Sequence, residues 1–136
     1  MSEFPIIIPG ECIPQGSKAV NRKTRTMFEA NPRLKEWRKE AGVALDQYIG
    51  TWFGAWTPWD GPLHVEVTFY MERGKTVTRE LPSVKPDIDK LMRALNDMLT
   101  ISGLIKDDAR ITSYWALKRY DDNPRTAIHN IREDKP

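Results

Sequence analysis

The residues with the clearest chemical potential are two pairs of aspartates between residues 85 and 111: Asp87 with Asp89, and Asp107 with Asp108. Carboxylates gathered around one point repel each other, so each raises the pKa of its neighbours unless a cation lies between them. Carboxylate oxygens are hard ligands, and the cation that suits them is Mg²⁺ or a similar divalent ion. If the chain folds the second pair back beside the first, up to four carboxylates surround one metal site.

The segment between the two pairs has the pattern of an amphipathic helix. Apolar side chains recur at helical spacing between residues 87 and 101: Leu91, Leu95, Met98 and Leu99. Gly103 is suited to the left-handed conformation that ends many helices. The two acidic pairs are therefore expected at the two ends of one helix-and-loop segment.

Each aspartate also has a purely structural interpretation. Asp87 can cap the helix, and Asp89 can interact with the helix dipole in the first turn. Asp107 and Asp108 can form a turn before the next strand. The spacing of the aspartates does not separate these roles from metal binding, so both interpretations stay open at this point.

The order of residues in this stretch resembles the signature of the RusA family of Holliday junction resolvases. The family pattern is Arg or Lys, Pro-Asp-x-Asp-Asn-Leu-x-Lys, a helix, a glycine and Asp-Asp-Ala-x-Val. This chain has KPDIDKLMR from Lys85, then Gly103, then DDARI from Asp107. Two positions depart from the pattern, because Lys90 stands at the family's asparagine and Arg93 at its helix lysine. An arginine keeps the charge but does not readily give up a proton.

The resemblance implies a homodimeric, Mg²⁺-dependent endonuclease that resolves Holliday junctions by paired phosphodiester cleavage in DNA recombination and repair, with Mn²⁺ as an alternative ion. The catalytic metal ligands correspond to Asp87, Asp89 and Asp108, with Asp107 as a further ligand and Arg93 as a further catalytic candidate. The expected partners are a four-way DNA junction and a second copy of the chain. Two alternatives remain: a junction-binding protein that does not cleave, and a metal-dependent nuclease that acts on flaps or single strands.

Positive charge is expected to contact DNA phosphates, and it must come from local clusters because the formal net charge is only +2. Lys85 and Lys90 adjoin the acidic motif and are candidates for binding the scissile or adjacent phosphate. Two basic loops, at about 14–27 and 72–84, supply the other candidates: Lys18, Arg22, Lys23, Arg25, Arg73, Lys75 and Arg79. The alternative interpretation of the first loop and of Lys90 is that their charges are exposed to solvent and do not contact DNA. Arg93 has the alternative of pairing with Asp97 on the helix surface.

The remaining pattern predicts one α+β domain over residues 1–136, a small mixed sheet with helices packed on one face. Strands are predicted at 4–9, 63–71, 111–120 and 125–131, and helices at 32–49 and 87–101, followed by a frayed polar tail at 132–136. Asn31 is expected to cap the first helix with Pro32 at its first position. In the strand at 111–120, Ile111, Trp115 and Leu117 are expected on one side.

An aromatic connector at 50–62 contains three tryptophans and Phe53, and it is predicted to form a lid over one end of the core. A dimer contact and a wedge that stacks on unpaired bases are the alternatives. The single cysteine, Cys12, excludes an intrachain disulfide and suits a reducing compartment. No apolar run is long enough to span a membrane. These features predict an intracellular protein, and the resemblance to the RusA family implies a cytoplasmic, nucleoid-associated protein of bacterial or phage origin.

Overall fold

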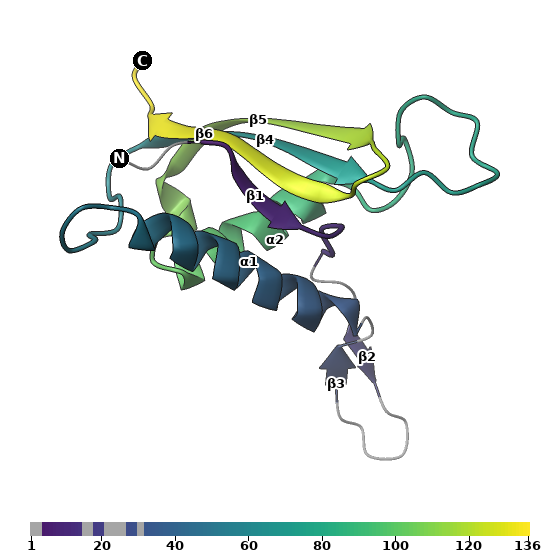
Figure 1. Ribbon diagram of the computed structural model, residues 1–136, viewed down its shortest axis with the longest axis horizontal. Coiled ribbons are helices and arrows are strands. Elements are labelled where there is room, and N and C mark those ends of the chain that lie inside the picture. The colour runs from purple at the N-terminus through teal and green to yellow at the C-terminus, as the bar shows by residue number, and fades with distance from the viewer. Residues whose placement is uncertain (1–3, 15–17, 21–26, 30–31) are drawn as a thin grey trace.

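A four-stranded mixed sheet lies against two helices, which cover one of its faces (Figure 1). The computed structural model describes residues 4–14, 18–20, 27–29 and 32–136. The order of strands in the sheet is β1-β6-β4-β5. The elements are β1 (Ile6–Pro9), α1 (Arg33–Gly50), β4 (Leu63–Met71), α2 (Ile88–Ile101), β5 (Ile111–Tyr120) and β6 (Arg125–Glu133). The predicted α+β class and the placement of both helices on one face are confirmed.

The central strand, β4, is parallel to β5 and antiparallel to β6. A parallel pair needs a crossover connection, and α2 supplies it between β4 and β5. The apolar face of α2 packs against the sheet, where Leu91, Leu95 and Leu99 are fully buried with Val67 and Phe69. The crossover also places the two ends of α2 at opposite ends of β5.

The first helix follows the predicted apolar spacing but begins one residue later than expected. Pro32 occupies the N-cap position of α1, and Asn31 lies outside the described residues. The buried side chains of α1 are Leu34, Trp37, Ala41, Leu45 and Tyr48. These side chains form the part of the core between α1 and the sheet.

The side chains of β5 do not lie on the faces that were predicted, because the strand contains a bulge. Leu63 pairs with Ile111 but His64 pairs with Ser113, so one extra residue lies in β5. One inserted residue turns every following side chain to the other face of a sheet. Ile111 packs against the core, whereas Trp115 is 51% exposed on the face without helices. The prediction that Ile111, Trp115 and Leu117 share one side is therefore wrong.

A short hairpin stands where a basic loop was predicted at about 14–27. Its strands, β2 (Lys18–Val20) and β3 (Met27–Glu29), pair antiparallel. Strands of three residues are too short to give a recognisable alternation in the sequence. Residues 21–26, which carry Arg22, Lys23 and Arg25, lie outside the described residues.

The C-terminal tail is held against the sheet instead of fraying from residue 132. Strand β6 continues to Glu133. The Asp134 carboxylate then accepts hydrogen bonds from Thr112 Oγ1 at 2.6 Å and Ser113 Oγ at 3.0 Å. These bonds lower the pKa of Asp134 below its ordinary value. No helix among the described residues is long and apolar enough to cross a membrane.

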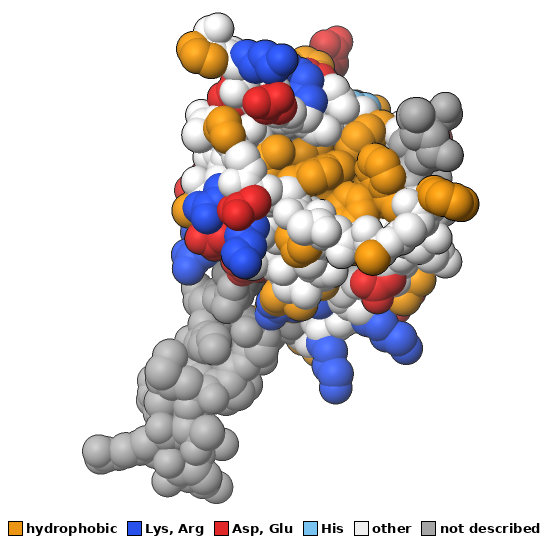
Figure 2. All heavy atoms as spheres, turned by 90° about the vertical axis from the view of Figure 1, so that its left-hand side faces the viewer, with side chains coloured by type: hydrophobic (Ala, Val, Ile, Leu, Met, Phe, Trp, Pro, Cys, Tyr) orange, Lys and Arg blue, Asp and Glu red, His pale blue; other side chains and the backbone are white. Residues whose placement is uncertain are grey.

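The aromatic connector covers one end of the core, as predicted for its three tryptophans. The rings of Trp52, Trp56 and Trp59 lie with their centroids 6.4 to 6.5 Å from that of Tyr48. Figure 2 views this end of the molecule and shows hydrophobic side chains gathered in one broad area. Phe53 is the exception, because it is fully exposed at 103%.

Candidate active site

The first acidic pair lies at the start of α2 with its carboxylates open to solvent. Asp87 occupies the N-cap position, but its side chain makes no capping hydrogen bond. Only its backbone oxygen accepts from the amides of Lys90 and Leu91, each at 3.1 Å. The Asp87 carboxylate lies 3.9 Å from Lys90 Nζ, and Asp89 follows in the first turn, also exposed. The side-chain capping role considered from the sequence is therefore not performed by Asp87.

The second acidic pair lies beyond the other end of α2, just before β5. Asp107 precedes a single 3₁₀ turn, η1 (Asp108–Arg110), and its backbone oxygen accepts from the Arg110 amide at 3.0 Å. The pKa of Asp108 is raised, first by a hydrogen bond with the Asp107 carboxyl, then by desolvation and by the charges of Asp107 and Asp97. Two carboxyl groups in contact repel when both are ionised, and a bound cation relieves that repulsion.

The two acidic pairs do not meet within one chain. The 14 residues of α2 span about 20 Å, since an α-helix rises about 1.5 Å per residue. Lys118 Nζ, near the end of β5, donates hydrogen bonds to the carbonyl oxygens of Val84 and Pro86 at 2.6 and 2.7 Å. Asp87 therefore lies near the end of β5, whereas Asp108 precedes its start. Among the described residues, no three His, Cys, Asp or Glu side chains are grouped as a metal site requires.

A cleft of about 380 Å³ opens beside Asp87 and contains the predicted cations Lys85 and Lys90. Glu11 and Arg33, which the sequence analysis missed, also line this cleft and approach each other to 3.5 Å. Neither residue lies near the acidic motif in the sequence, so no local pattern could have indicated them. Cys12 lines the same cleft, and burial raises the pKa of its thiol, which agrees with a structural role.

The loop from residue 72 to the start of α2 is held against β5 by its arginines. The Arg73 guanidinium lies over the Tyr120 ring, 4.8 Å from the centroid. Arg79 donates a hydrogen bond to the Tyr120 hydroxyl at 2.7 Å. Lys75 is exposed. Arg73 and Arg79 thus stabilise the loop itself, a role that the sequence analysis did not assign to them.

Arg93 lies exposed on α2 and does not pair with Asp97, although both residues are in the described part of the chain. The surface ion pair offered as its alternative role is therefore absent. Lys18 lies in β2, but no side-chain placement is described for it. Arg22, Lys23 and Arg25 lie outside the described residues, so their contact with DNA stays a prediction.

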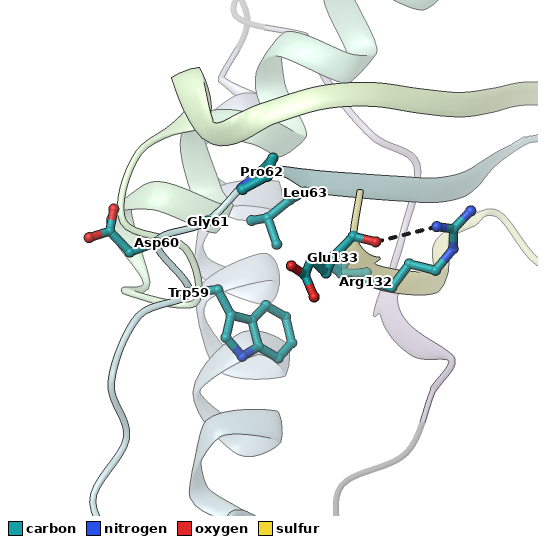
Figure 3. Close-up of a pocket in the computed structure, with 8 residues that line it drawn as sticks. Trp59, Asp60, Gly61, Pro62, Leu63, Arg132 and Glu133 are labelled. Carbon is teal, nitrogen blue, oxygen red and sulfur yellow. Dashed lines mark hydrogen bonds between the residues drawn. The ribbon is translucent and has the colours of Figure 1, made fainter. Parts of the chain in front are cut away.

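The aromatic connector positions the turn that carries the second acidic pair. The Trp59 amide donates to Leu104 O at 3.1 Å, and the Lys106 amide donates to Trp59 O at 2.8 Å. Next to this contact, Arg110 Nε donates to the Asp60 carboxylate at 2.7 Å. Figure 3 shows the hollow beside these residues, with Trp59 at its wall and Asp60 pointing away from it. The contact between Asp60 and Arg110 was not predicted from the sequence, because the two residues lie 50 positions apart.

Comparison with known proteins identifies the family. The sequence model described as Endodeoxyribonuclease RusA matches residues 9–130 of the 136. The match includes both acidic pairs and every described element that positions them. A search of curated proteins found no match. Nucleases of this family act on branched DNA, and membership of the family indicates that a divalent metal ion is required. The chain therefore belongs to the RusA family of endodeoxyribonucleases, the hydrolases that resolve Holliday junctions.

Proposed function

We propose that the chain is a Mg²⁺-dependent, homodimeric resolvase that makes paired cuts in a four-way junction during DNA recombination and repair. The observation that carries the proposal is the pair of exposed aspartates at the start of α2 within a chain of this family. Their carboxylates are not used as helix caps. We place the protein in the cytoplasm, associated with nucleoid DNA, because its substrate is there.

The donor set fits a hard divalent cation. Asp87, Asp89 and Asp108 would hold it, with Asp107 as a further ligand. The support is the exposed, uncapped carboxylate of Asp87 and the contact of the Asp108 carboxyl with that of Asp107, whose hydrogen bond raises the pKa of Asp108 more than desolvation or nearby charge does. A bound Mg²⁺, or Mn²⁺ in its place, would supply a Lewis acid for the phosphate and lower the pKa of water.

A dimer can bring together the two acidic pairs that lie apart in one chain. Since α2 separates the acidic pairs by about 20 Å, the first pair of one protomer must meet the second pair of another to form a cluster. A two-fold axis that runs the two α2 helices antiparallel achieves this twice, and it produces two identical sites. Two identical sites suit a four-way junction, which presents two equivalent strands.

The chain's own cations would bring the phosphate to these carboxylates. Lys85 and Lys90 line the cleft beside Asp87 and reduce the repulsion that a phosphate meets there. Arg93 would bind phosphate as a fixed charge, because a guanidinium does not release its proton at neutral pH. The loop cations Arg73, Lys75 and Arg79 and the hairpin cations Lys18, Arg22, Lys23 and Arg25 would contact the phosphates of the junction arms.

The experiment is incubation with a mobile four-way junction in Mg²⁺, with the products mapped on all four strands. We expect paired nicks placed symmetrically on two opposed strands, and no nicks in EDTA. Asp89→Asn should bind the junction but not cut it, whereas the exposed Asp122→Asn variant, which removes the same charge elsewhere, should cut normally. Cleavage confined to flaps or single strands would replace the proposal with a different nuclease activity, and binding without any cleavage would refute the catalytic role.

A further inference from the structure

The cleft beside Asp87 has two walls that come from distant parts of the chain. One wall is the segment that leads into α2, with Lys85, Asp87 and Lys90. The other is the chain that follows β1, residues 11–14, together with Arg33, the first residue of α1. The residues of the second wall have no part in the proposed cleavage chemistry, although they lie beside its acidic motif.

Hydrogen bonds hold both walls in place. Lys118 Nζ donates to the carbonyl oxygens of the residues on either side of Lys85, at 2.6 and 2.7 Å. The Gly10 amide, directly before Glu11, donates to the Pro124 carbonyl oxygen at 3.1 Å. A site whose walls are already fixed loses little conformational entropy when it takes up a ligand.

The inner surface of the cleft is apolar. It is lined by the buried side chains Cys12, Ile13 and Met71 and by the half-buried prolines Pro14 and Pro86. Enzymes that take a base out of the DNA helix hold it against apolar side chains. The volume of about 380 Å³ lies within the range of about 300–1,000 Å³ that is typical of sites for small organic ligands. The size and the apolar lining therefore suit the flat ring of a nucleobase.

Two charged groups of the cleft, Glu11 and Arg33, can form hydrogen bonds with the edge of such a ring. They approach each other to only 3.5 Å, whereas a full charge-assisted hydrogen bond is about 2.7–2.9 Å long. The Arg33 side chain is 61% exposed and that of Glu11 is 21% exposed. A carboxylate accepts two parallel hydrogen bonds and a guanidinium carries five N–H donors, so both groups can bind a ligand while they remain neighbours.

We propose that this cleft holds the base next to the scissile phosphate and that it selects guanine. The Watson–Crick edge of guanine has one acceptor, O6, beside two donors, N1–H and the N2 amino group. The Glu11 carboxylate accepts from both donors, and the Arg33 guanidinium donates to O6. Thymine, adenine and cytosine each have one donor group on this edge, so they leave one carboxylate oxygen without a partner.

The position of the cleft determines which base it can reach. This inference rests on the proposed function, because a phosphate held beside Asp87 is what brings the neighbouring base to the cleft. Extruding a base costs least where stacking is already interrupted, as at the crossover of a four-way junction. Glu11 repels phosphate, so a base that lacks the matching donors is disfavoured in the cleft.

The test varies the base on each side of the cut in otherwise identical four-way junctions. Single-turnover cleavage by the wild-type protein in Mg²⁺ should be about tenfold faster beside guanine than beside any other base, the discrimination expected of one bidentate contact. Glu11→Gln, whose amide cannot accept both hydrogen bonds, should cut all four sequences at similar rates. Glu80→Gln is the matched control and should keep the preference, because Glu80 is exposed and does not line the cleft.

Base analogues test the same contact without a protein variant. The analogue 7-deazaguanine lacks N7, which proteins read in the major groove, but it keeps the Watson–Crick edge and should be cut as fast as guanine. Inosine lacks the N2 amino group and should be cut more slowly. Equal cleavage beside all bases, or slow cleavage beside 7-deazaguanine, would overturn the proposal. Loss of all cleavage in Glu11→Gln would overturn it too, because Glu11 would then be part of the catalytic site.

A binding measurement separates this inference from the proposed function. The fluorescent guanine analogue 6-methylisoxanthopterin, placed at the crossover, brightens when it leaves the base stack. Its fluorescence should rise when Asp89→Asn binds the junction, and the rise should be absent when the same protein also carries Glu11→Gln. No rise, or an equal rise in both complexes, would overturn the contact with Glu11. A wild-type protein that shows the Glu11-dependent rise but cuts no junction would refute the proposed function and leave the guanine site standing.

Discussion

Asp87 and Asp108 lie beyond opposite ends of α2, whose 14 residues hold them about 20 Å apart in one chain. The separation is fixed by the parallel pairing of β4 with β5, because the connecting helix must run back along the sheet. The consequence is that one chain does not bring all four carboxylates to one point.

The pair of Asp107 and Asp108 should make metal binding depend on pH. A raised pKa means that folded Asp108 keeps its proton to a higher pH than the unfolded chain does. In the absence of metal, Asp108 therefore contributes to the free energy of unfolding at low pH. This contribution is lost as the pH rises through the pKa of Asp108 in the folded state. Metal binding needs the ionised form, so affinity should rise over the same window.

Asp107→Asn tests this linkage, because it removes the main cause of the shift. The pKa of Asp108 should fall, and the rise in metal affinity should move to lower pH. The measurement is a carboxyl ¹³C NMR titration without metal, paired with metal binding by calorimetry. The lowered pKa of Asp121, which is caused by the Asn123 amide and Arg125, should stay unchanged as an internal control. An unaltered titration of Asp108 would contradict the assigned cause.

Asp60 should matter for activity more than for stability. Its carboxylate accepts from Arg110 Nε at 2.7 Å and steadies the turn that carries Asp107 and Asp108. The pair is exposed, and exposed ion pairs add little to the free energy of unfolding. Asp60→Asn should therefore leave the Tm nearly unchanged but reduce single-turnover cleavage by about tenfold, since small misplacements of catalytic groups are costly. Equal cleavage rates for the wild-type protein and Asp60→Asn would show that Asp60 does not position the catalytic aspartates.

The Trp56 indole should stabilise the end of α2. Its Nε1 donates to the Gly103 carbonyl at 2.7 Å, and Gly103 adopts φ +80°, the left-handed conformation expected of a helix stop. Trp56→Phe keeps an aromatic ring but leaves the carbonyl without this donor. The free energy of unfolding should fall by about 1 kcal/mol, measured by urea denaturation. A loss near zero would mean that water replaces the indole without penalty.

Two cations on the same loop should behave differently on replacement. Lys75→Ala should reduce the dependence of junction binding on salt, because fewer counterions are released, and it should leave stability unchanged. Arg79→Ala should also loosen the loop, because Arg79 holds the Tyr120 hydroxyl. Binding measured over a salt series, with thermal melting beside it, separates the two effects. An unchanged salt slope for Lys75→Ala would remove that residue from the DNA interface.

Arg93→Lys should be tolerated or should improve turnover. The side chain is exposed and makes no ion pair with Asp97, so no contact within the described chain requires a guanidinium. Lysine restores the residue type of the family signature. The measurement is single-turnover cleavage in Mg²⁺. Complete loss of cleavage by a well-folded variant would show that bidentate phosphate binding by arginine is needed.

Local patterns in the sequence predicted the helices, the central strand and the chemical motif. The stripe of Leu91, Leu95 and Leu99 is buried as predicted, because helical periodicity depends only on neighbouring residues. The bulge that turns Trp115 outward depends instead on the register with β4. The Asp60–Arg110 contact is likewise long-range and leaves no local pattern.

The relative placement of the acidic pairs also depends on long-range pairing and leaves no local pattern in the sequence. Their closeness in sequence suggested one cluster, but parallel strand pairing, which the local pattern does not encode, places them at opposite ends of β5. The separation is visible only once the crossover through α2 is known. The contribution of Glu11 and Arg33 to the cleft beside Asp87 could not be predicted for the same reason, because both residues lie far from the motif in the sequence.

The most direct test of the composite site is complementation between two inactive variants, Asp89→Asn and Asp108→Asn. Each should bind a four-way junction and fail to cut it. In a mixed dimer one site receives both substitutions, and the other receives Asp89 from one protomer and Asp108 from its partner. An equimolar mixture should therefore regain about a quarter of the wild-type sites, and it should make single nicks instead of paired cuts.

Mixed dimers should be isolated with two different affinity tags before the cleavage assay. Single-turnover nicking in Mg²⁺ by the mixed dimer, absent from both parent variants, is the result that the composite site predicts. Mixed dimers that bind the junction as tightly as the wild-type protein but make no nick would contradict it.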